Sequence, residues 1–314
     1  MKETRVVFMG TPEFAVPILE TLIKNTTVVL VVSQPDKPVG RKRVITPSPV
    51  KQSALGHGIE VITPLKIRDD YARIEEVEPD LIVTCAYGQI VPKAVLDIPK
   101  LGPINVHASL LPKLRGGAPI HRAILEGFAK TGITIMYMDE GMDSGDIISS
   151  RDVEITLDDT LDSLSQKLRK VGSELLESTL PSIISGTATR TPQKDDEVSF
   201  GYVIKKDDEL VTFDRKTKEV YDHIRGLNSV PGAYFVMNGK HVKVYASRMN
   251  MEKKGEVGTI NSVYEDGFGV GTLDGEIVIT DIKPEGKNRV KVKDYFNGIK
   301  GESLLGVKLN DQLD

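Results

Sequence analysis

The sequence is poor in the residues that cross-link small domains or hold metal clusters. Its 314 residues include one cysteine, Cys85, and no tryptophan. One cysteine cannot form an intrachain disulfide or a thiolate metal cluster, and this content fits a reducing compartment. Cys85 follows the apolar residues 81–84 and has no obvious activating partner, so we expect a structural role and not a nucleophilic one. We also expect a cytoplasmic location.

The chain also lacks a long apolar run and an excess of basic charge. No run approaches the roughly 20 apolar residues of a membrane span, so we expect no membrane partner. The net charge is −4, whereas proteins that bind nucleic acid by bulk electrostatics usually carry a basic face. Any nucleic-acid contact must therefore be local. Basic residues gather at Arg41, Lys42 and Arg43, and again at Lys283, Lys287, Arg289, Lys291 and Lys293.

The length favours two domains, because one hydrophobic core rarely supports 314 residues. In the first half, short apolar runs alternate with helical patterns; the runs are residues 5–9, 28–32, 61–62, 81–84 and 104–106. This alternation predicts an α/β fold with a doubly wound, mostly parallel, Rossmann-like sheet. A long amphipathic helix is expected over residues 160–184. We place the first domain at residues 1–189.

The second half has a different pattern. Residues 190–206 are polar and are expected to form a linker. Residues 207–314 are expected to begin with a helix near residues 218–225 and to continue as short strands separated by Asn-Gly and Asp-Gly turns. This pattern predicts a small, OB-like β-barrel domain.

A doubly wound fold raises the question of a dinucleotide site, which the first turn argues against. Gly10 is the one glycine where a dinucleotide fingerprint has three, and Glu13 would place a negative charge near a pyrophosphate. Residues 33–35 lack the acidic residue that holds a ribose hydroxyl. We expect Thr11 to cap the following helix and Pro12 to occupy its first position.

Two polar residues alternate at the end of a predicted strand, Asn105 and His107. Side chains two residues apart on a strand face the same way, and ligands of such folds bind beyond the carboxyl ends of the strands. An amide donor and an imidazole therefore converge there. By themselves the two residues could equally be a loop cap and a core histidine.

Asp143 lies downstream in an acidic loop, residues 138–146, which contains two glycines. The loop could hold a metal or be a solvated turn, and its spacing is not that of an EF-hand. A carboxylate beside His107 would orient the imidazole and favour its charged form, which is a better donor toward a developing oxyanion.

Together these residues resemble a known family. Asn105-x-His107, the following Ser-Leu-Leu-Pro-x-x-Arg-Gly segment over residues 109–116 and the loop with Asp143 are similar to the formyl-transfer site of enzymes that use 10-formyltetrahydrofolate. Further segments resemble the branch of that family whose acceptor is methionine carried on initiator tRNA; they are residues 8–12, 34–38, 40–41, 46–51, 86–90, 115–120, 224–225 and 231–233.

The resemblance implies both a reaction and the residues that perform it. The α-amine of methionyl initiator tRNA would attack the formyl carbon, Asn105 and His107 would stabilise the oxyanion, and Asp143 would orient His107 and help to move the proton. It implies neither a metal nor a covalent enzyme intermediate. The folate co-substrate would contact Tyr87, Gly88, Ile90, Ser109, Leu110, Leu111 and Pro112. The tRNA would contact Arg41, Lys42, Arg43 and the C-terminal domain.

One segment departs from the family pattern, because Ser229 and Val230 stand where a Pro-Trp pair is usual. This departure bears on local packing and on one edge of the tRNA surface. Two alternatives stay open: a formyltransferase for another amine, such as a glycinamide nucleotide or an amino sugar, and a non-catalytic tRNA-binding protein. No obligate protein partner is evident from the sequence.

Overall fold

The computed structural model describes residues 1–40, 42–298 and 301–311. Two compact units account for the chain. The first unit comprises Met1–Ile120, Lys130–Glu154 and Ser165–Tyr202; the second comprises His121–Ala129, Ile155–Leu164 and Val203–Asp314. Two short segments from the middle of the chain thus belong to the same unit as the C-terminal half.

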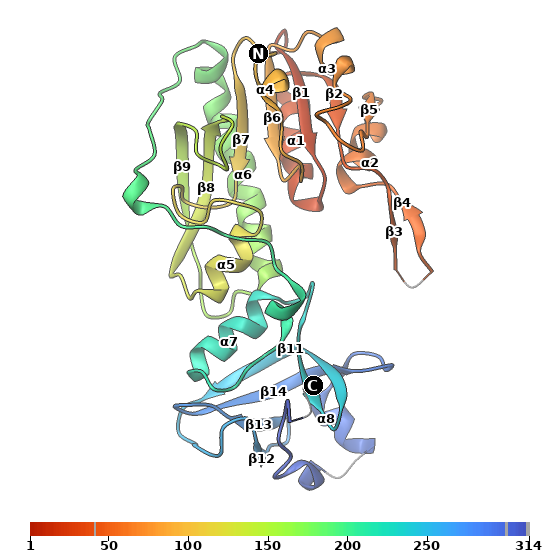
Figure 1. Ribbon diagram of the computed structural model, residues 1–314, viewed down its shortest axis with the longest axis vertical. Coiled ribbons are helices and arrows are strands. Elements are labelled where there is room, and N and C mark those ends of the chain that lie inside the picture. The colour runs from red at the N-terminus through yellow and green to blue at the C-terminus, as the bar shows by residue number, and fades with distance from the viewer. Residues whose placement is uncertain (41, 299–300, 312–314) are drawn as a thin grey trace. The chain divides into compact units, whose positions relative to one another are not determined.

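A seven-stranded sheet forms the centre of the first unit (Figure 1). Its strands are β1 (Arg5–Gly10), β2 (Thr27–Val32), β5 (Val61–Ile62), β6 (Leu81–Cys85), β7 (Pro103–His107), β8 (Lys130–Tyr137) and β9 (Ile147–Glu154). The spatial order is β5-β2-β1-β6-β7-β8-β9; the first five strands pair in parallel, and β8 pairs antiparallel with both β7 and β9. The predicted doubly wound, mostly parallel sheet is therefore confirmed.

The strand order explains where a ligand can bind. The chain runs outward from β1 through β2 to β5, and then returns to β6 on the other side of β1. Right-handed crossovers place the helices of the two halves on opposite faces, so the connections diverge between β1 and β6. A crevice opens at such a switch point, beyond the carboxyl ends of the strands.

The helices of the chain vary widely in length. They are α1 (Val16–Asn25), α2 (Pro49–Gly56), α3 (Ala72–Glu76), α4 (Lys93–Leu96), α5 (Pro119–Leu125), α6 (Leu161–Ile184), α7 (Thr217–Gly226) and α8 (Val292–Tyr295). Short 3-10 helices lie at Glu13–Ala15, Asp195–Glu197, Lys206–Glu209, Phe296–Gly298 and Gly301–Leu304. The long helix expected over residues 160–184 is present as α6. None of the described helices is long and apolar enough to cross a membrane.

The first turn differs from the expectation for Thr11 and Pro12. A 3-10 turn over Glu13–Ala15 precedes α1, and its cap, Pro12, makes no side-chain hydrogen bond. The Thr11 hydroxyl instead donates to the carbonyl oxygen of Tyr87 at 2.9 Å. The capping prediction for Thr11 was wrong, because its hydroxyl ties the end of β1 to the end of β6.

Residues 33–50, which connect β2 to α2, contain a hairpin. Strands β3 (Lys37–Val39) and β4 (Val44–Thr46) pair antiparallel. Gly40 follows β3 with a positive φ of 69°, which glycine adopts without steric cost. Arg41 lies outside the described residues.

A six-stranded antiparallel sheet dominates the second unit. Its strands are β10 (Ala233–Met237), β11 (Lys240–Asn250), β12 (Ile260–Val263), β13 (Phe268–Gly271), β14 (Glu276–Pro284) and β15 (Val290–Lys291). Asn238 and Gly239 join β10 to β11, both with positive φ, as their sequence predicts. The sheet and α7 enclose an apolar core that contains Phe235, Phe268 and Ile224. The expected small β domain is confirmed.

Candidate active site

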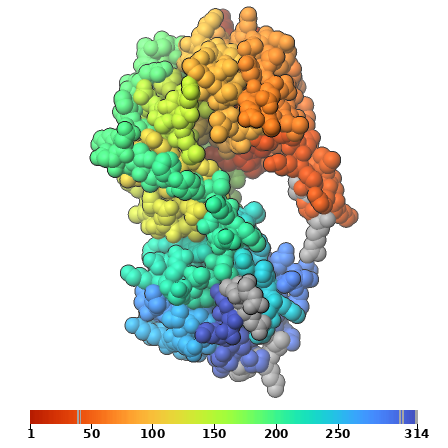
Figure 2. Space-filling model, in the orientation of Figure 1, coloured from red at the N-terminus to blue at the C-terminus, as the bar shows by residue number. Residues whose placement is uncertain are grey.

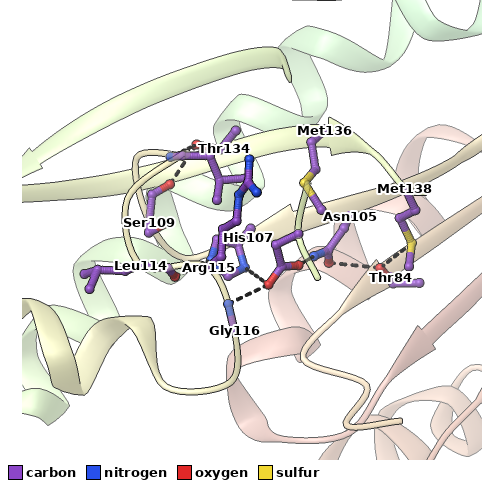
Figure 3. A network of polar contacts seen from close by, with 12 residues as sticks. Thr84, Asn105, His107, Ser109, Leu114, Arg115, Gly116, Thr134, Met136 and Met138 are labelled. Carbon is purple, nitrogen blue, oxygen red and sulfur yellow. Dashed lines mark hydrogen bonds and ion pairs between the residues drawn. The ribbon is translucent and has the colours of Figure 1, made fainter. Parts of the chain in front are cut away.

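Strand β7 carries Asn105 and His107 at its carboxyl end, one strand away from the switch point (Figure 3). Its register places Asn105 beside Thr84 of β6 on one side and Met136 of β8 on the other. The imidazole of His107 is buried, with a side-chain exposure of 6%. A rigid, doubly flanked strand thus fixes both side chains.

Asp143 meets both of these residues. One carboxylate oxygen, Oδ1, accepts a hydrogen bond from Asn105 Nδ2 at 3.1 Å. The other, Oδ2, accepts one from the Gly116 backbone N–H at 2.8 Å and lies 3.5 Å from His107 Nδ1. The structure therefore brings together the three side chains that the sequence singles out, although they are spread over 39 residues (105 to 143).

The Asn105 amide has a fixed orientation. Thr84 Oγ1 donates to Asn105 Oδ1 at 2.9 Å, and the Asp143 carboxylate can only accept, so Nδ2 must face Asp143. An amide nitrogen carries two hydrogens, and Asp143 takes one. Among the described residues no hydrogen bond uses the other, which leaves it available to a substrate oxygen.

The loop after β7 is tied to β8. Thr134 donates to the Ser109 carbonyl at 2.7 Å and accepts from the Leu111 N–H at 3.1 Å, while Ser109 Oγ donates to the Lys113 carbonyl at 2.6 Å. Leu110 lies against β8 at Gly132, where a Cβ would stand 2.6 Å from Leu110 Cδ2. The loop predicted to contact folate is therefore a well-anchored element.

The other predicted folate contacts follow β6. Tyr87 is 4% exposed, its ring packs in the apolar core, and its hydroxyl has no hydrogen-bond partner among the described residues. Its carbonyl oxygen accepts from Thr11 and from Gln34 Nε2, which joins the ends of three strands. Gly88 has a positive φ of 89°, and Ile90 is 88% exposed. Of these three residues, Gly88 and Ile90 are exposed and Tyr87 is buried.

The acidic loop after β8 forms an internal turn. Asp139 accepts hydrogen bonds from the Gly141 N–H at 3.0 Å and from Ser144 Oγ at 2.7 Å. Nowhere in residues 1–40, 42–298 and 301–311 do three His, Cys, Asp or Glu side chains form a group that could hold a metal ion. Cys85 ends β6 fully buried, and burial raises the pKa of its thiol to about 12. A thiol in that state is not a nucleophile at neutral pH.

The basic residues predicted to contact tRNA belong to the hairpin formed by β3 and β4. Lys42 and Arg43 lie in the connection between these two strands and are exposed, and the Arg43 N–H donates to the Gly40 carbonyl at 3.1 Å. Arg41 is not among the described residues.

Sequence reasoning missed three residues that hold the site: Thr84, Thr134 and Gln193. Thr84 was within reach of such reasoning, because it stands at the end of a predicted strand adjacent to that of Asn105. Thr134 sits in an apolar strand without a distinguishing pattern. Gln193 lies in the polar segment interpreted as a linker, where nothing local marks it.

The cluster can polarise a carbonyl oxygen and move a proton. Asn105 supplies an amide N–H, His107 a titratable ring, and Asp143 a carboxylate that accepts two hydrogen bonds. Such a set suits a reaction whose transition state develops an oxyanion, and it offers no activated side-chain nucleophile. Fold and site together define an acyl-transfer enzyme built on a doubly wound sheet.

Comparison with known proteins agrees with that class. The N-terminal formyl transferase family matches residues 4–180, and the formyl transferase C-terminal domain matches residues 203–300. The chain therefore belongs to the formyl transferase family. It is 50% identical to the methionyl-tRNA formyltransferase of Bacillus mycoides over 98% of this chain and 99% of that protein. The same enzyme of Bacillus anthracis is also 50% identical over the same shares.

Solved structures share the fold at lower identity. The sugar 3N-formyl transferase WlaRD, crystallised with dTDP and 5-N-formyl-THF, has a TM-score of 0.68 and 21% identity, and covers 92% of this chain and 100% of its own. HypX from Aquifex aeolicus, in complex with tetrahydrofolic acid, has a TM-score of 0.65 and 19% identity, and covers 96% of this chain and 48% of its own. At these identities the likeness supports the fold alone.

Proposed function

We propose that this protein transfers the formyl group of 10-formyltetrahydrofolate to the α-amino group of methionine carried on initiator tRNA. The observation that carries the proposal is 50% identity with methionyl-tRNA formyltransferases along 98% of the chain. The cluster of Asn105, His107 and Asp143 supplies chemistry suited to that reaction. Because initiator tRNA is charged and used in the cytoplasm, the proposal also places the protein there.

The reaction needs no redox step. The neutral α-amine attacks the formyl carbon, so a carbon–nitrogen bond forms and the carbonyl oxygen becomes an oxyanion. Collapse of this tetrahedral intermediate breaks the bond between the formyl carbon and N10. The proton lost by the amine ends on N10, which leaves as tetrahydrofolate.

Each member of the cluster has a part in this scheme. The remaining N–H of Asn105 Nδ2 donates to the oxyanion. His107 Nδ1 lies 3.5 Å from Asp143, too far for a committed hydrogen bond, so a hydrogen on this atom can also serve the oxyanion. Asp143 fixes the Asn105 amide, stands beside Nδ1 of the ring, and accepts the proton of the attacking amine on its way to N10.

The folate lies across the ends of β6 and β7 in this proposal. The loop Ser109, Leu110, Leu111 and Pro112 flanks its ring system, and the backbone at Tyr87 and Gly88 reads its polar edge. Ile90 adds apolar contact at the rim. The fixed position of the loop on Thr134 means that little ordering is needed on binding.

We assign tRNA contacts in the second unit to the outer face of β10, β11 and β14. Tyr234, Lys243 and Lys283 are directly opposite one another on these strands. The Lys243 ammonium already contacts Glu209 at 3.9 Å and the Pro231 carbonyl, whereas Lys283 has no ion pair among the described residues, so Lys283 is the cation of this row that is available to a phosphate. Tyr245 lies in the next row with Arg289 4.4 Å from its ring centre. Basic and aromatic side chains on a small antiparallel domain suit an RNA strand.

The test compares acceptors under one assay. Formyl transfer from labelled 10-formyltetrahydrofolate should be efficient with charged initiator tRNA and weak with charged elongator tRNA. Amino-sugar nucleotides and glycinamide nucleotides form the other arms, since the fold also occurs in sugar formyltransferases. A preference for either of these small amines, or equal use of both tRNAs, would overturn the proposal.

The face on β11 and β14 is tested by charge reversal. Lys283→Glu should raise KM for charged initiator tRNA and reduce its salt dependence, while kcat stays near the wild-type value. Lys254→Glu, which changes an exposed residue on the loop after β11, is the matched control. Equal KM values for the two variants would remove this face from the proposal.

A further inference from the structure

The segment over residues 186–202 lies on the loops of the active site. In Figure 2 it is the green stretch on the outside of the first unit. The Arg115 N–H donates to the Ser199 carbonyl at 2.9 Å, and the Gly201 N–H donates to the Arg115 carbonyl at 2.7 Å. Thr191 pairs with Ile147 through two backbone hydrogen bonds of 2.8 and 3.0 Å. This segment lies between the two matched family regions, residues 4–180 and 203–300.

Gln193 uses its whole side-chain amide in this segment. Its Nε2 donates to the carbonyl oxygens of Asp143 at 2.9 Å and Gly145 at 2.8 Å. Its Oε1 accepts from Arg115 Nε at 3.0 Å and Nη2 at 2.8 Å. A primary amide has two hydrogens to donate and two lone pairs to share, so all four capacities are satisfied.

Both ends of this link matter for the cluster. Asp143 has a positive φ of 49°, a conformation that is unfavourable for a residue other than glycine and persists only where neighbours hold it. Gln193 holds the carbonyl of that residue. Arg115 is 9% exposed, and it precedes Gly116, whose N–H donates to the Asp143 carboxylate. Gln193 thus fixes Asp143 in two ways. It binds the backbone carbonyl of Asp143 directly, and through Arg115 it holds the segment whose Gly116 N–H binds the Asp143 carboxylate.

We propose that Gln193 is a positioning residue of the formyl-transfer site, which holds the Asp143 carboxylate against Asn105 and His107. This inference rests on the proposed function. Glutamine alone fits, because glutamate cannot donate to the two carbonyls and lysine would repel Arg115. Asparagine is one methylene too short to keep all four bonds.

Two substitutions separate the two sides of the amide. Gln193→Met keeps the length and loses every hydrogen bond. Gln193→Glu keeps the contact with Arg115 and turns the contacts with the Asp143 and Gly145 carbonyls repulsive. Gln52→Met is the matched control, since Gln52 is an exposed glutamine of α2 whose amide donates to the Pro47 carbonyl at 2.8 Å.

We expect both Gln193 variants to lose about 10- to 100-fold in kcat, as a displacement of about 1 Å at a reacting group does. KM for charged initiator tRNA and for 10-formyltetrahydrofolate should stay within about threefold, as expected for an interaction made only in the transition state. Gln52→Met should match the wild type in kcat and in both KM values.

Hydrogen exchange gives a readout that does not depend on turnover. The backbone of residues 138–146 should exchange faster in Gln193→Met than in the wild type or in Gln52→Met. Normal kcat in Gln193→Met would overturn the inference and leave the proposed function standing. Near-normal kcat in Gln193→Glu would overturn the part assigned to the Asp143 carbonyl. An inactive wild type with faster exchange in the variant would refute the proposed function instead.

Discussion

The Nε2 atom of His107 lies 3.1 Å from the carbonyl oxygen of Leu114, and this contact determines what the other ring nitrogen can do. A carbonyl oxygen only accepts, so Nε2 carries a hydrogen. Any further proton must therefore bind at Nδ1, which faces Asp143. Leu114 adopts a positive φ of 57°, so the loop is held in an uncommon conformation at the residue that presents this carbonyl.

Removal of the imidazole should abolish most turnover without unfolding the protein. Because one oxyanion donor contributes on the order of 100- to 1,000-fold in rate, His107→Ala should lower kcat by at least that factor. Steady-state kinetics and a thermal melt measure the two effects. His57→Ala is the control, since His57 is partly exposed on α2's C-terminal side and pairs with Glu20 at 2.9 Å. Near-normal turnover in His107→Ala would remove this residue from the mechanism.

Thr84 should matter through the orientation of Asn105. Thr84→Val keeps the shape but removes the donor to Asn105 Oδ1, so the amide can turn and direct its oxygen toward Asp143. A net hydrogen bond is worth about 1 kcal/mol, so kcat should fall roughly fivefold. Thr84→Ser retains the hydroxyl and should restore most of the activity. If Val and Ser variants behave alike, the hydroxyl does not orient the amide.

Much of this site follows from strand alternation and strand order. Asn105 and His107 stand two residues apart on a predicted strand, and parallel strands bring Thr84 beside Asn105 at the same sheet edge. The roles of Thr11 and Gln193 could not be predicted, because each bonds to a residue distant in the chain: 76 residues for Thr11 to Tyr87, and 50 for Gln193 to Asp143. Polarity predicts a surface segment at residues 186–202 but not which loops it contacts.

Arg41 provides a test of acceptor recognition at the hairpin formed by β3 and β4. Arginine presents a planar set of donors to phosphates and base edges, which lysine does not reproduce. Arg41→Ala should therefore reduce kcat/KM for charged initiator tRNA by a factor that corresponds to a loss of about 1–3 kcal/mol in transition-state binding. Arg41→Lys should recover part of this loss. The dissociation constant of the folate should not change. Unchanged efficiency, or a parallel loss of folate binding, would contradict this role; Lys254→Ala serves as the control.

His223 should make the stability of the protein depend on pH. Burial, helped by the positive charge of Arg215, lowers the pKa of His223 from 6.5 to about 4. The contacts agree with a neutral ring, because Arg215 donates to Nδ1 at 3.1 Å and Nε2 faces the Asp208 carbonyl at 2.9 Å. As the pH falls from 6.5 to 4, the unfolded chain takes up a proton here that the folded chain refuses. The free energy of unfolding must therefore decrease across that window.

The size of this decrease follows from the shift. One pKa unit corresponds to 1.36 kcal/mol, so His223 should cost the folded state about 2 kcal/mol between pH 7 and pH 4.5. Denaturant unfolding at the two pH values measures it. His223→Gln can accept from Arg215 and donate to the Asp208 carbonyl without titrating, so it should lose about 2 kcal/mol less than the wild type over the same interval. Equal losses in the two proteins would show that His223 is protonated in the folded state near its ordinary pKa.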